Sequence, residues 1–210
     1  MTKQYGFYFD ASACTGCKAC QMACKDKHDL DVGLLWRRVY EITGGEWKQD
    51  GKTWIPDIAA YHLSISCNHC ENPVCSAVCP TQAIYKRQDG IVLIDHSKCM
   101  GCRYCEWACP YSALQFDEAF GTMSKCHFCY DLIDRGESPA CVTACPMRAL
   151  DFGDMTRLKK DYSGTGRVYP LPDESLTQPA LLIKSHKDSE KAEKAKAIVS
   201  NGIEVGRARK

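Results

Sequence analysis

The sequence has no long hydrophobic run. Its longest purely aliphatic stretches are four residues each, Ile91 to Ile94 and Ala180 to Ile183, whereas a membrane-spanning helix needs about 20 apolar residues. The first five residues show neither an apolar signal region nor an Arg-Arg pair ahead of one. We therefore expect no transmembrane segment and no export signal in this chain.

An excess of charge of one sign is also lacking. Lys and Arg number 27 and Asp and Glu number 26, which gives a formal net charge of +1 and excludes a strongly basic nucleic-acid-binding surface. No G-x-G-x-x-G follows a strand, no Walker loop is present, and no nucleophile–base pair is evident. We expect no nucleic acid partner, no catalytic residue and no direct small-molecule substrate.

Cysteine, by contrast, is abundant, and all sixteen copies fall into four groups of four. The stretch from Cys99 to Pro110 has the spacing C-x2-C-x2-C-x3-C-P, in which three thiolates bind one iron–sulfur cluster and the fourth binds another. At four thiolates per cluster, the groups predict four [4Fe-4S] clusters. They are Cys14, Cys17, Cys20 and Cys24 (group I); Cys67, Cys70, Cys75 and Cys79 (group II); Cys99, Cys102, Cys105 and Cys109 (group III); and Cys126, Cys129, Cys141 and Cys145 (group IV).

Disulfides and zinc are the alternative uses of so many cysteines. Thiols repeated two residues apart are a poor way to connect distant segments. Zinc sites usually join two C-x2-C pairs across a long spacer, and a third close cysteine with a fourth before proline departs from that pattern. We therefore favour iron–sulfur clusters, and a metal analysis that finds about four zinc ions and no iron would overturn this prediction.

The pairing of the groups decides the ligand sets, because a ferredoxin cluster takes its fourth ligand from the partner group. Groups II and III are joined through Asp89-Gly90, a hairpin signal, which leaves group I to pair with group IV. Sixteen thiolates on four oxidised clusters of roughly +2 each would bring the net charge of the loaded protein to about −7. The predicted sets are Cys14, Cys17, Cys20 and Cys145 (site 1); Cys126, Cys129, Cys141 and Cys24 (site 2); Cys67, Cys70, Cys75 and Cys109 (site 3); and Cys99, Cys102, Cys105 and Cys79 (site 4).

The fold class that follows is α+β, with two bacterial-ferredoxin-like 2[4Fe-4S] modules, one inserted in the other, long irregular loops and a C-terminal arm. Residues 1–56 and 116–153 would form the first module, with groups I and IV. Residues 57–115 would form the inserted second module, with groups II and III, and residues 154–210 the arm and a charged tail.

Two short repeats support this duplication. The pattern D-x-S-x-C-x-G-C begins at Asp10 and again at Asp95, each time after a strand-like run, and its glycine is expected to bring backbone amides close to a cluster. The pattern C-P-x-x-A occurs in groups II, III and IV. Its proline ends the ligand loop, and its small alanine is expected to let the next segment pack closely.

The 42 residues between Cys24 and Cys67 are longer than a ferredoxin loop. Trp36 to Ile42 and Ile58 to Ile65 are expected as strands, with a turn at Gly44-Gly45. The four tryptophans are interpreted as core or interface residues. The two histidines inside C-x-x-C pairs are interpreted as loop residues that donate a hydrogen bond, with potential tuning or proton coupling as the alternative. They are His69 and His127.

The composition changes after Leu150. Asp154 is expected to cap a short helix from Met155 to about Tyr162. Three prolines follow between residues 170 and 179, which is typical of an extended arm rather than a packed core. We expect this arm to lie on a partner subunit.

A set of segments in and between the cysteine groups carries a resemblance to a known family. The set is Tyr5-Gly6-Phe7, Trp36 to Glu41, Gly44-Gly45, Ser64 to Cys70, Gly101 to Cys105 and Met147 to Gly153. Over about residues 4–184, the sequence closely resembles the four-cluster electron-transfer subunits (B subunits) of anaerobic dimethyl sulfoxide reductases. These belong to the wider family of electron-transfer subunits of molybdopterin oxidoreductases.

The resemblance implies a non-catalytic subunit that passes single electrons from a membrane anchor subunit, which oxidises menaquinol, to a molybdopterin catalytic subunit. Groups II and III would face the anchor, and groups I and IV the catalytic subunit. Some relatives carry Trp in place of one group III cysteine and bind a three-iron cluster, whereas Cys102 is intact here. The resemblance also implies a peripheral position on the periplasmic face of the bacterial cytoplasmic membrane, after export with the catalytic subunit.

Two other functions stay open at this point. The protein could serve a related molybdo-oxidoreductase that acts on polysulfide, thiosulfate, selenate or formate, or it could be a free polyferredoxin. Potentials of such clusters span about −700 to +450 mV, so the sequence does not give the direction of electron flow.

Overall fold

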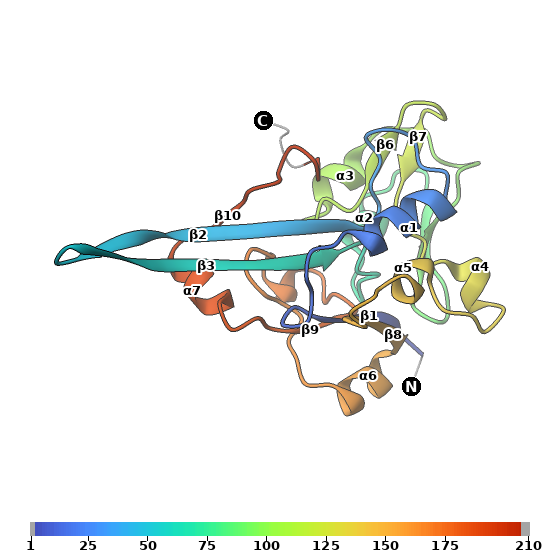
Figure 1. The fold of residues 1–210 in the computed structure, drawn as a ribbon. Coiled ribbons are helices and arrows are strands. Elements are labelled where there is room, and N and C mark those ends of the chain that lie inside the picture. Colours follow the sequence, from blue (N-terminus) through green and yellow to red (C-terminus); the bar gives the residue numbers. More distant parts are fainter. Residues whose placement is uncertain (1–2, 207–210) are drawn as a thin grey trace.

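A three-stranded sheet joins the N-terminal strand to two strands from the last third of the chain in the computed structural model, which describes residues 3–206 (Figure 1). The middle strand β1 (Tyr5–Asp10) is antiparallel to β8 (Leu150–Asp154) and parallel to β9 (Leu181–Lys184). Phe9 and Ile183 are fully buried between the strands and the rest of the core. The strand expected after residue 5 is confirmed, while the first two and last four residues of the predicted domain ranges lie outside the described residues.

A long hairpin is formed by β2 (Arg38–Asp50) and β3 (Thr53–Ile65), which pair in register along their whole length. Both expected strands are confirmed, but the turn lies at Gly51 and not at Gly44-Gly45, which stay inside the ladder. A Cβ on Gly44 would come within 2.6 Å of the Ala197 side chain. Gly44 therefore serves the close approach of the C-terminal segment, which is a non-local reason that the sequence pattern does not reveal.

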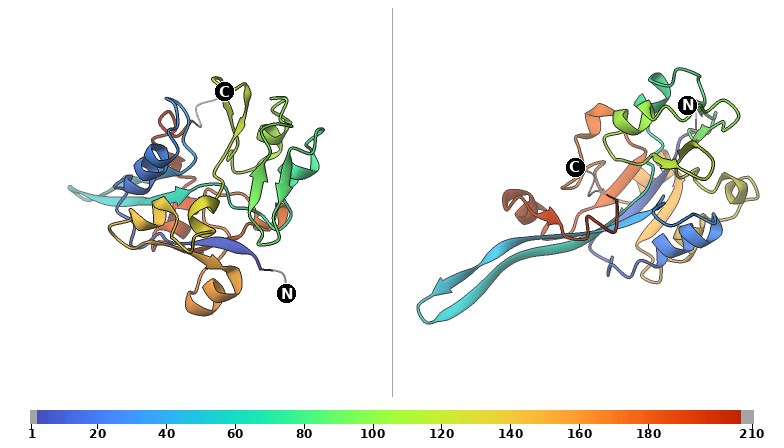
Figure 2. Two further views of the ribbon diagram at one scale, coloured as in Figure 1. Left: turned by 90° about the vertical axis from the view of Figure 1, so that its right-hand side faces the viewer. Right: turned by 90° about the horizontal axis from the view of Figure 1, so that it is seen from above.

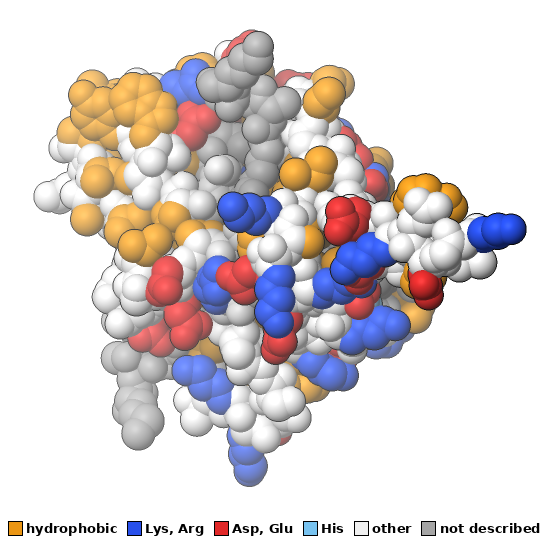
Figure 3. Space-filling model, turned by 90° about the vertical axis from the view of Figure 1, so that its left-hand side faces the viewer, with side chains coloured by type: hydrophobic (Ala, Val, Ile, Leu, Met, Phe, Trp, Pro, Cys, Tyr) orange, Lys and Arg blue, Asp and Glu red, His pale blue; other side chains and the backbone are white. Residues whose placement is uncertain are grey.

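The outer half of this hairpin projects beyond the rest of the molecule (Figure 2). Strand alternation puts Trp47, Trp54 and Ile58 on one face of it, and they are 57%, 61% and 43% exposed. Figure 3, which faces the side from which the hairpin projects, shows hydrophobic side chains beside charged ones on it. Core packing is thus the wrong interpretation for Trp47, Trp54 and the still more exposed Trp107, and interface packing stays a prediction.

Two small hairpins flank the third cysteine group. β4 (Ile84–Lys86) pairs with β5 (Val92–Ile94), which confirms the hairpin expected at Asp89-Gly90, and β6 (Gln115–Asp117) pairs with β7 (Thr122–Ser124). The helices between these strands are short. They are α1 (Ala19–Lys27), α2 (Val74–Ala77), α3 (Tyr104–Ala108), α4 (Tyr130–Ile133), α5 (Ala140–Thr143) and α6 (Met155–Asp161), followed by the 3-10 turn η1 (Glu174–Leu176) and α7 (Ser189–Lys194).

The C-terminal segment packs on the body, so the expectation of an extended arm is wrong for its described part. β9 occupies the free edge of β1, and β10 (Ile198–Val199) pairs with β2. Ala192 and Val205 are fully buried although the segment is mostly charged. Small apolar side chains and ion pairs such as Lys191 to Asp57, at 2.5 Å, are enough to dock it. The expected helix cap is confirmed, because the Asp154 side chain accepts a hydrogen bond from the Thr156 backbone N–H.

The predicted mixture of helices and strands is confirmed, whereas the nested arrangement of two modules stays a prediction. Within residues 3–206, no helix combines the length and the apolar character that crossing a bilayer requires.

Candidate metal centres

All sixteen cysteines are free thiols, and most of them gather around three small cavities. Each cavity is lined by four cysteines from two sequence groups, together with apolar side chains. The cavities hold Cys14, Cys17, Cys20 and Cys145; Cys67, Cys70, Cys75 and Cys109; and Cys79, Cys99, Cys102 and Cys105. These are the predicted ligand sets of sites 1, 3 and 4.

The remaining four cysteines also lie together. Cys24, near the end of α1, lies close enough to Cys126, Cys141 and Cys129 for their thiolate forms to raise its pKa, and α1 packs against α5, the helix that carries Cys141. This is the predicted set of site 2. The allocation of ligands stays a prediction, and the closeness of the thiols in each set supports it.

The first repeat builds the same local structure twice. The Asp10 side chain accepts hydrogen bonds from the backbone N–H and the hydroxyl of Ser12, and Asp95 does the same with Ser97. These side-chain turns set the start of each cysteine loop. The glycines, Gly16 and Gly101, have φ of +71° and +69°. At these glycines a Cβ would meet the His62 ring and the Gly121 carbonyl, respectively, so part of the need for glycine is packing against other segments.

The three copies of the second repeat, C-P-x-x-A, also share one backbone conformation. The fourth residue of the repeat, which is Gln82, Ser112 or Arg148, has φ between +51° and +54° and donates its N–H to the carbonyl of the cysteine three residues earlier. The alanine that follows is at most 3% exposed in every copy. The expectation that this alanine allows close packing is confirmed. The three alanines are Ala83, Ala113 and Ala149.

Backbone and side-chain donors surround the thiols. The N–H groups of Met123, Phe128 and Ala149 lie 3.3–3.4 Å from cysteine sulfurs. His69 is fully buried, and its Nδ1 accepts the Val92 N–H at 3.0 Å, so its proton is on Nε2, which has no hydrogen-bond partner among the described residues. His69 thus accepts at Nδ1 and lines the site 3 cavity, and the expected donation by its ring stays a prediction for Nε2.

The donor set fits iron–sulfur cubes. In the described part of the protein, no three His, Cys, Asp or Glu side chains are placed to bind a single metal ion. One zinc ion would need its thiolates to converge at Zn–S distances of about 2.3 Å, whereas a cube holds its four ligands farther apart. The unpaired buried Nε2 of His69 matches a site whose bound group accepts hydrogen bonds, and such donors are known to raise cluster potentials.

Burial keeps several of the cluster-free thiols protonated. It raises the pKa of Cys14 and Cys129 to about 11 and the pKa of Cys75 and Cys126 to about 12. Because only the thiolate binds iron, loading of a cluster must displace these protons, and the metal supplies the free energy for doing so.

The sites follow one another in order through close pairs of cysteines. Cys20 of site 1 lies close enough to Cys141 of site 2, and Cys126 of site 2 to Cys67 of site 3, for the thiolate forms of Cys141 and Cys67 to raise the pKa of Cys20 and of Cys126. Sites 3 and 4 share one apolar cluster with Cys75 and Cys105. Two cysteines are exposed, Cys17 in site 1 and Cys102 in site 4, while the others are buried or half-buried. The most accessible thiols thus belong to the first and last sites of the series.

A ligand-contacting histidine was not foreseen from the sequence. His28 Nε2 lies 3.4 Å from Cys129 Sγ. Its ring packs near Trp36 and His127, with centroids 4.8 and 4.5 Å away. Burial, with His127 and Lys27, lowers the pKa of His28 to about 4, so the ring is neutral at pH 7. His28 follows α1 and has no spacing that marks it in the sequence.

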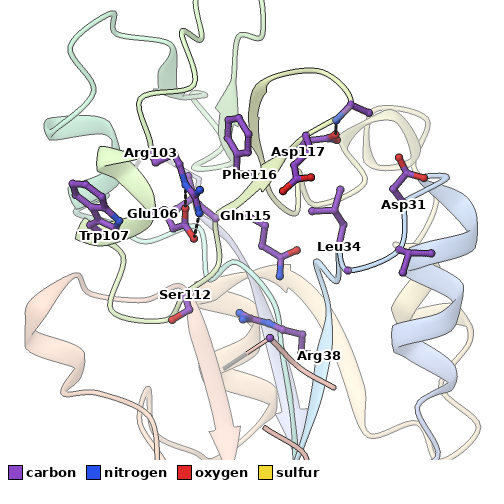
Figure 4. A pocket seen from close by; sticks show the side chains of 16 residues that line it. Asp31, Leu34, Arg38, Arg103, Glu106, Trp107, Ser112, Gln115, Phe116 and Asp117 are labelled. Atoms are coloured by element: carbon purple, nitrogen blue, oxygen red, sulfur yellow. Dashed lines mark hydrogen bonds and ion pairs between the residues drawn. The ribbon is translucent and has the colours of Figure 1, made fainter. Parts of the chain in front are cut away.

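A further cavity lies beside α3 and β6, and no cysteine is among the residues that line it. Figure 4 shows Arg103, the residue before α3, joined by hydrogen bonds to Glu106 of α3 at its edge, with Trp107 beside them and Arg38 below. It is a broad groove with charges of both signs, next to the helix that follows Cys102.

Two family models match this sequence, a 4Fe-4S dicluster domain over residues 58–155 and a 4Fe-4S binding domain over residues 5–26. The B subunit of the anaerobic dimethyl sulfoxide reductase of Escherichia coli is 48% identical over 98% of this chain and 100% of its own length. The B subunit of the polysulfide reductase of Wolinella succinogenes is 40% identical over 89% and 97%. The thiosulfate reductase electron transfer subunit of Salmonella typhi is 40% identical over 73% and 77%.

Proposed function

The protein belongs to the family of iron–sulfur electron-transfer subunits that includes the B subunit of anaerobic dimethyl sulfoxide reductase, and we propose that it conducts single electrons through four [4Fe-4S] clusters between two partner subunits. It is an electron-transfer subunit rather than a catalytic one, and it binds multiple [4Fe-4S] clusters. Its own residues hold the clusters, surround their sulfurs with donors and exclude water from all but the first and last sites.

The clusters would be held by the four cysteine sets described above, in the order site 1, site 2, site 3, site 4. The closeness of thiols within each set supports this allocation, and the pairs Cys20–Cys141 and Cys126–Cys67 support the order. A cube supplies one-electron redox chemistry when bound. The polypeptide then supplies short spacing between neighbouring sites and an apolar surrounding.

The nested arrangement of two ferredoxin modules is part of this proposal. Helix α1 of group I packs on α5 of group IV, and α2 of group II packs on α3 of group III. Each helix contact therefore joins the two groups that were predicted to exchange their fourth ligand, which is what one module inserted in another would produce.

Electrons would enter and leave at the two ends of the series. Site 4, with the exposed Cys102, would receive electrons from a membrane anchor subunit that oxidises menaquinol. Site 1, with the exposed Cys17, would pass them to a molybdopterin catalytic subunit. This subunit would be exported together with the catalytic subunit, and the complex would lie on the periplasmic face of the cytoplasmic membrane. The higher identity to the dimethyl sulfoxide reductase subunit than to the polysulfide and thiosulfate relatives favours a sulfoxide as final acceptor.

The observation that carries the proposal is that the exposed thiols, Cys17 and Cys102, belong to opposite ends of a series of buried sites. The test is to purify the protein with its natural partners and measure metal content and paramagnetic resonance. We expect about sixteen irons per chain, interacting cubane signals after reduction by a menaquinol analogue, and loss of those signals when dimethyl sulfoxide is added. About four zinc ions without iron, purification as a lone monomer, or sulfoxide reduction by this chain alone would each contradict it.

A further inference from the structure

Arg37 is a buried cation without a carboxylate partner. The residue is 2% exposed and precedes β2, at the base of the long hairpin. Its Nη1 donates to the Ser64 hydroxyl at 3.1 Å, its Nη2 donates to the Ser66 hydroxyl at 3.0 Å, and the guanidinium lies 4.7 Å from the Phe7 ring centroid. Among residues 3–206, no Asp or Glu forms an ion pair with it, and its Nε has no hydrogen-bond partner.

A guanidinium stays charged at all physiological pH values, and an unpaired buried charge is strongly destabilising. A compensating negative charge must therefore lie close to Arg37 in the working protein. The groups that act on it most strongly after burial are four cysteines from two sites. They are Cys141, Cys20, Cys126 and Cys24.

These four cysteines divide between site 1, which has Cys20, and site 2, which has the other three. As thiols they carry no charge, but as ligands of a cube they are thiolates and each loaded site is an anion. Arg37 thus lies between two groups that are negative only when loaded, and each becomes more negative by one charge when it is reduced.

Ser64 connects the guanidinium to one of these ligands. Because arginine can only donate, the Ser64 oxygen must accept from Nη1. The Ser64 hydroxyl proton is then free to point to Cys20 Sγ, which lies 3.3 Å from the oxygen. The charge of Arg37 thereby reaches site 1 through a polarised hydroxyl as well as through space, whereas Ser66 leads to the Cys67 carbonyl and to no sulfur.

We propose that Arg37 is the shared counter-cation of the clusters at sites 1 and 2 and raises the reduction potentials of both. The positive charge stabilises the reduced form of each cluster more than the oxidised form, so both accept electrons more readily than they would without it. This inference rests on the cluster allocation proposed above. Arg37 would then act on the clusters through its charge, without contacting a substrate.

The test is a redox titration of the four clusters by paramagnetic resonance in the purified complex, with Arg37→Gln, Arg37→Lys and Ser64→Ala. We expect Arg37→Gln to shift two clusters to more negative potentials and to leave the other two close to their original values. Arg37→Lys keeps the charge and should shift them much less, and Ser64→Ala should lower the potential of one cluster only. Two controls are matched to these variants: Ser66→Ala removes the other hydroxyl partner, and Arg135→Gln removes an exposed arginine paired with Glu137.

Equal shifts in Arg37→Gln and Arg37→Lys would overturn the proposal, because a structural role depends on the guanidinium shape and a counter-cation depends on charge. Unchanged potentials in Arg37→Gln with full iron content would also overturn it. If Arg37→Gln does not retain all clusters, Arg37→Met serves as the neutral variant: a shift of two clusters to more negative potentials supports the proposal, and no shift contradicts it. Failure of the proposed electron-transfer function would show instead in the wild-type complex, as missing clusters or clusters that menaquinol does not reduce.

Discussion

His28 offers a direct test of how the polypeptide sets the potential of one site. Its Nε2 lies 3.4 Å from Cys129 Sγ, and its ring is neutral because burial lowers its pKa to about 4. When Cys129 is a thiolate it can only accept, so Nε2 must carry the proton and donate. Replacement by Phe would keep the aromatic packing with Trp36 and His127 and remove the donor.

The size of the effect follows from the strength of such a bond. A hydrogen bond to a charged group contributes about 1.5–3 kcal/mol. Because the added electron is shared over the cube, we expect this bond to be only about 1 kcal/mol stronger in the reduced state than in the oxidised state. For one electron, a tenfold change in equilibrium corresponds to about 59 mV. We therefore expect His28→Phe to lower the midpoint potential of the site 2 cluster by about 40 mV.

The assay is a potentiometric titration followed by low-temperature paramagnetic resonance, which separates the clusters by their midpoint potentials. His28→Gln keeps a hydrogen-bond donor, so its site 2 potential should lie between those of His28→Phe and the wild type. His186→Phe is the control, because His186 stacks on Tyr61 at 5.6 Å and touches no cysteine among the described residues. A shift spread over all four clusters, or a site 2 potential that rises, would refute the reasoning.

Three further predictions concern the end of the series, the hairpin and a helix cap. Cys102→Ser should convert or lose one cluster and slow quinol-linked turnover, and unchanged turnover with all clusters retained would contradict the assignment of Cys102 to site 4. Trp47→Ser with Trp54→Ser should reduce the yield of co-purified partner subunits while iron content stays constant; equal yield would mean that the exposed face of the hairpin is not an interface. Asp154→Ala removes the acceptor for the Thr156 N–H and should cost about 1 kcal/mol, or about 2–4 °C in Tm, whereas the surface change Asp161→Asn should cost less than half of that.

The shapes of the cysteine loops were predictable because their signal is local. Each cysteine loop is specified within about ten residues, and the D-x-S turns at Asp10 and Asp95 and the left-handed residue of each C-P-x-x-A repeat recur wherever the pattern recurs. The cap at Asp154 is equally local and was also predictable.

The features that were missed depend on contacts between distant segments. Gly44 looked like a turn because glycine pairs usually mark turns, but it is required by Ala197 at the other end of the sequence. The strand β9 was missed because it is short and lies among prolines and charged residues. Its three buried residues are nevertheless enough to pair with the open edge of β1. Arg37 was visible only as part of a family-like segment, because its role comes from four cysteines that the sequence places up to about a hundred residues away.

The buried cations and the cysteines together connect folding to cluster loading. Besides Arg37, the side chain of Lys125 is 3% exposed, donates to the carbonyl of Cys126 at 3.1 Å and acts electrostatically on Cys75. Without clusters, these cations lie among protonated thiols, and each is buried at a cost that the backbone carbonyls only partly offset. With clusters, the thiols would become thiolates, and their negative charge would compensate the buried cations. The positive charges that would oppose folding of the empty protein would therefore favour reduction of the bound clusters. Folding stability and reduction potential would thus depend on the same residues.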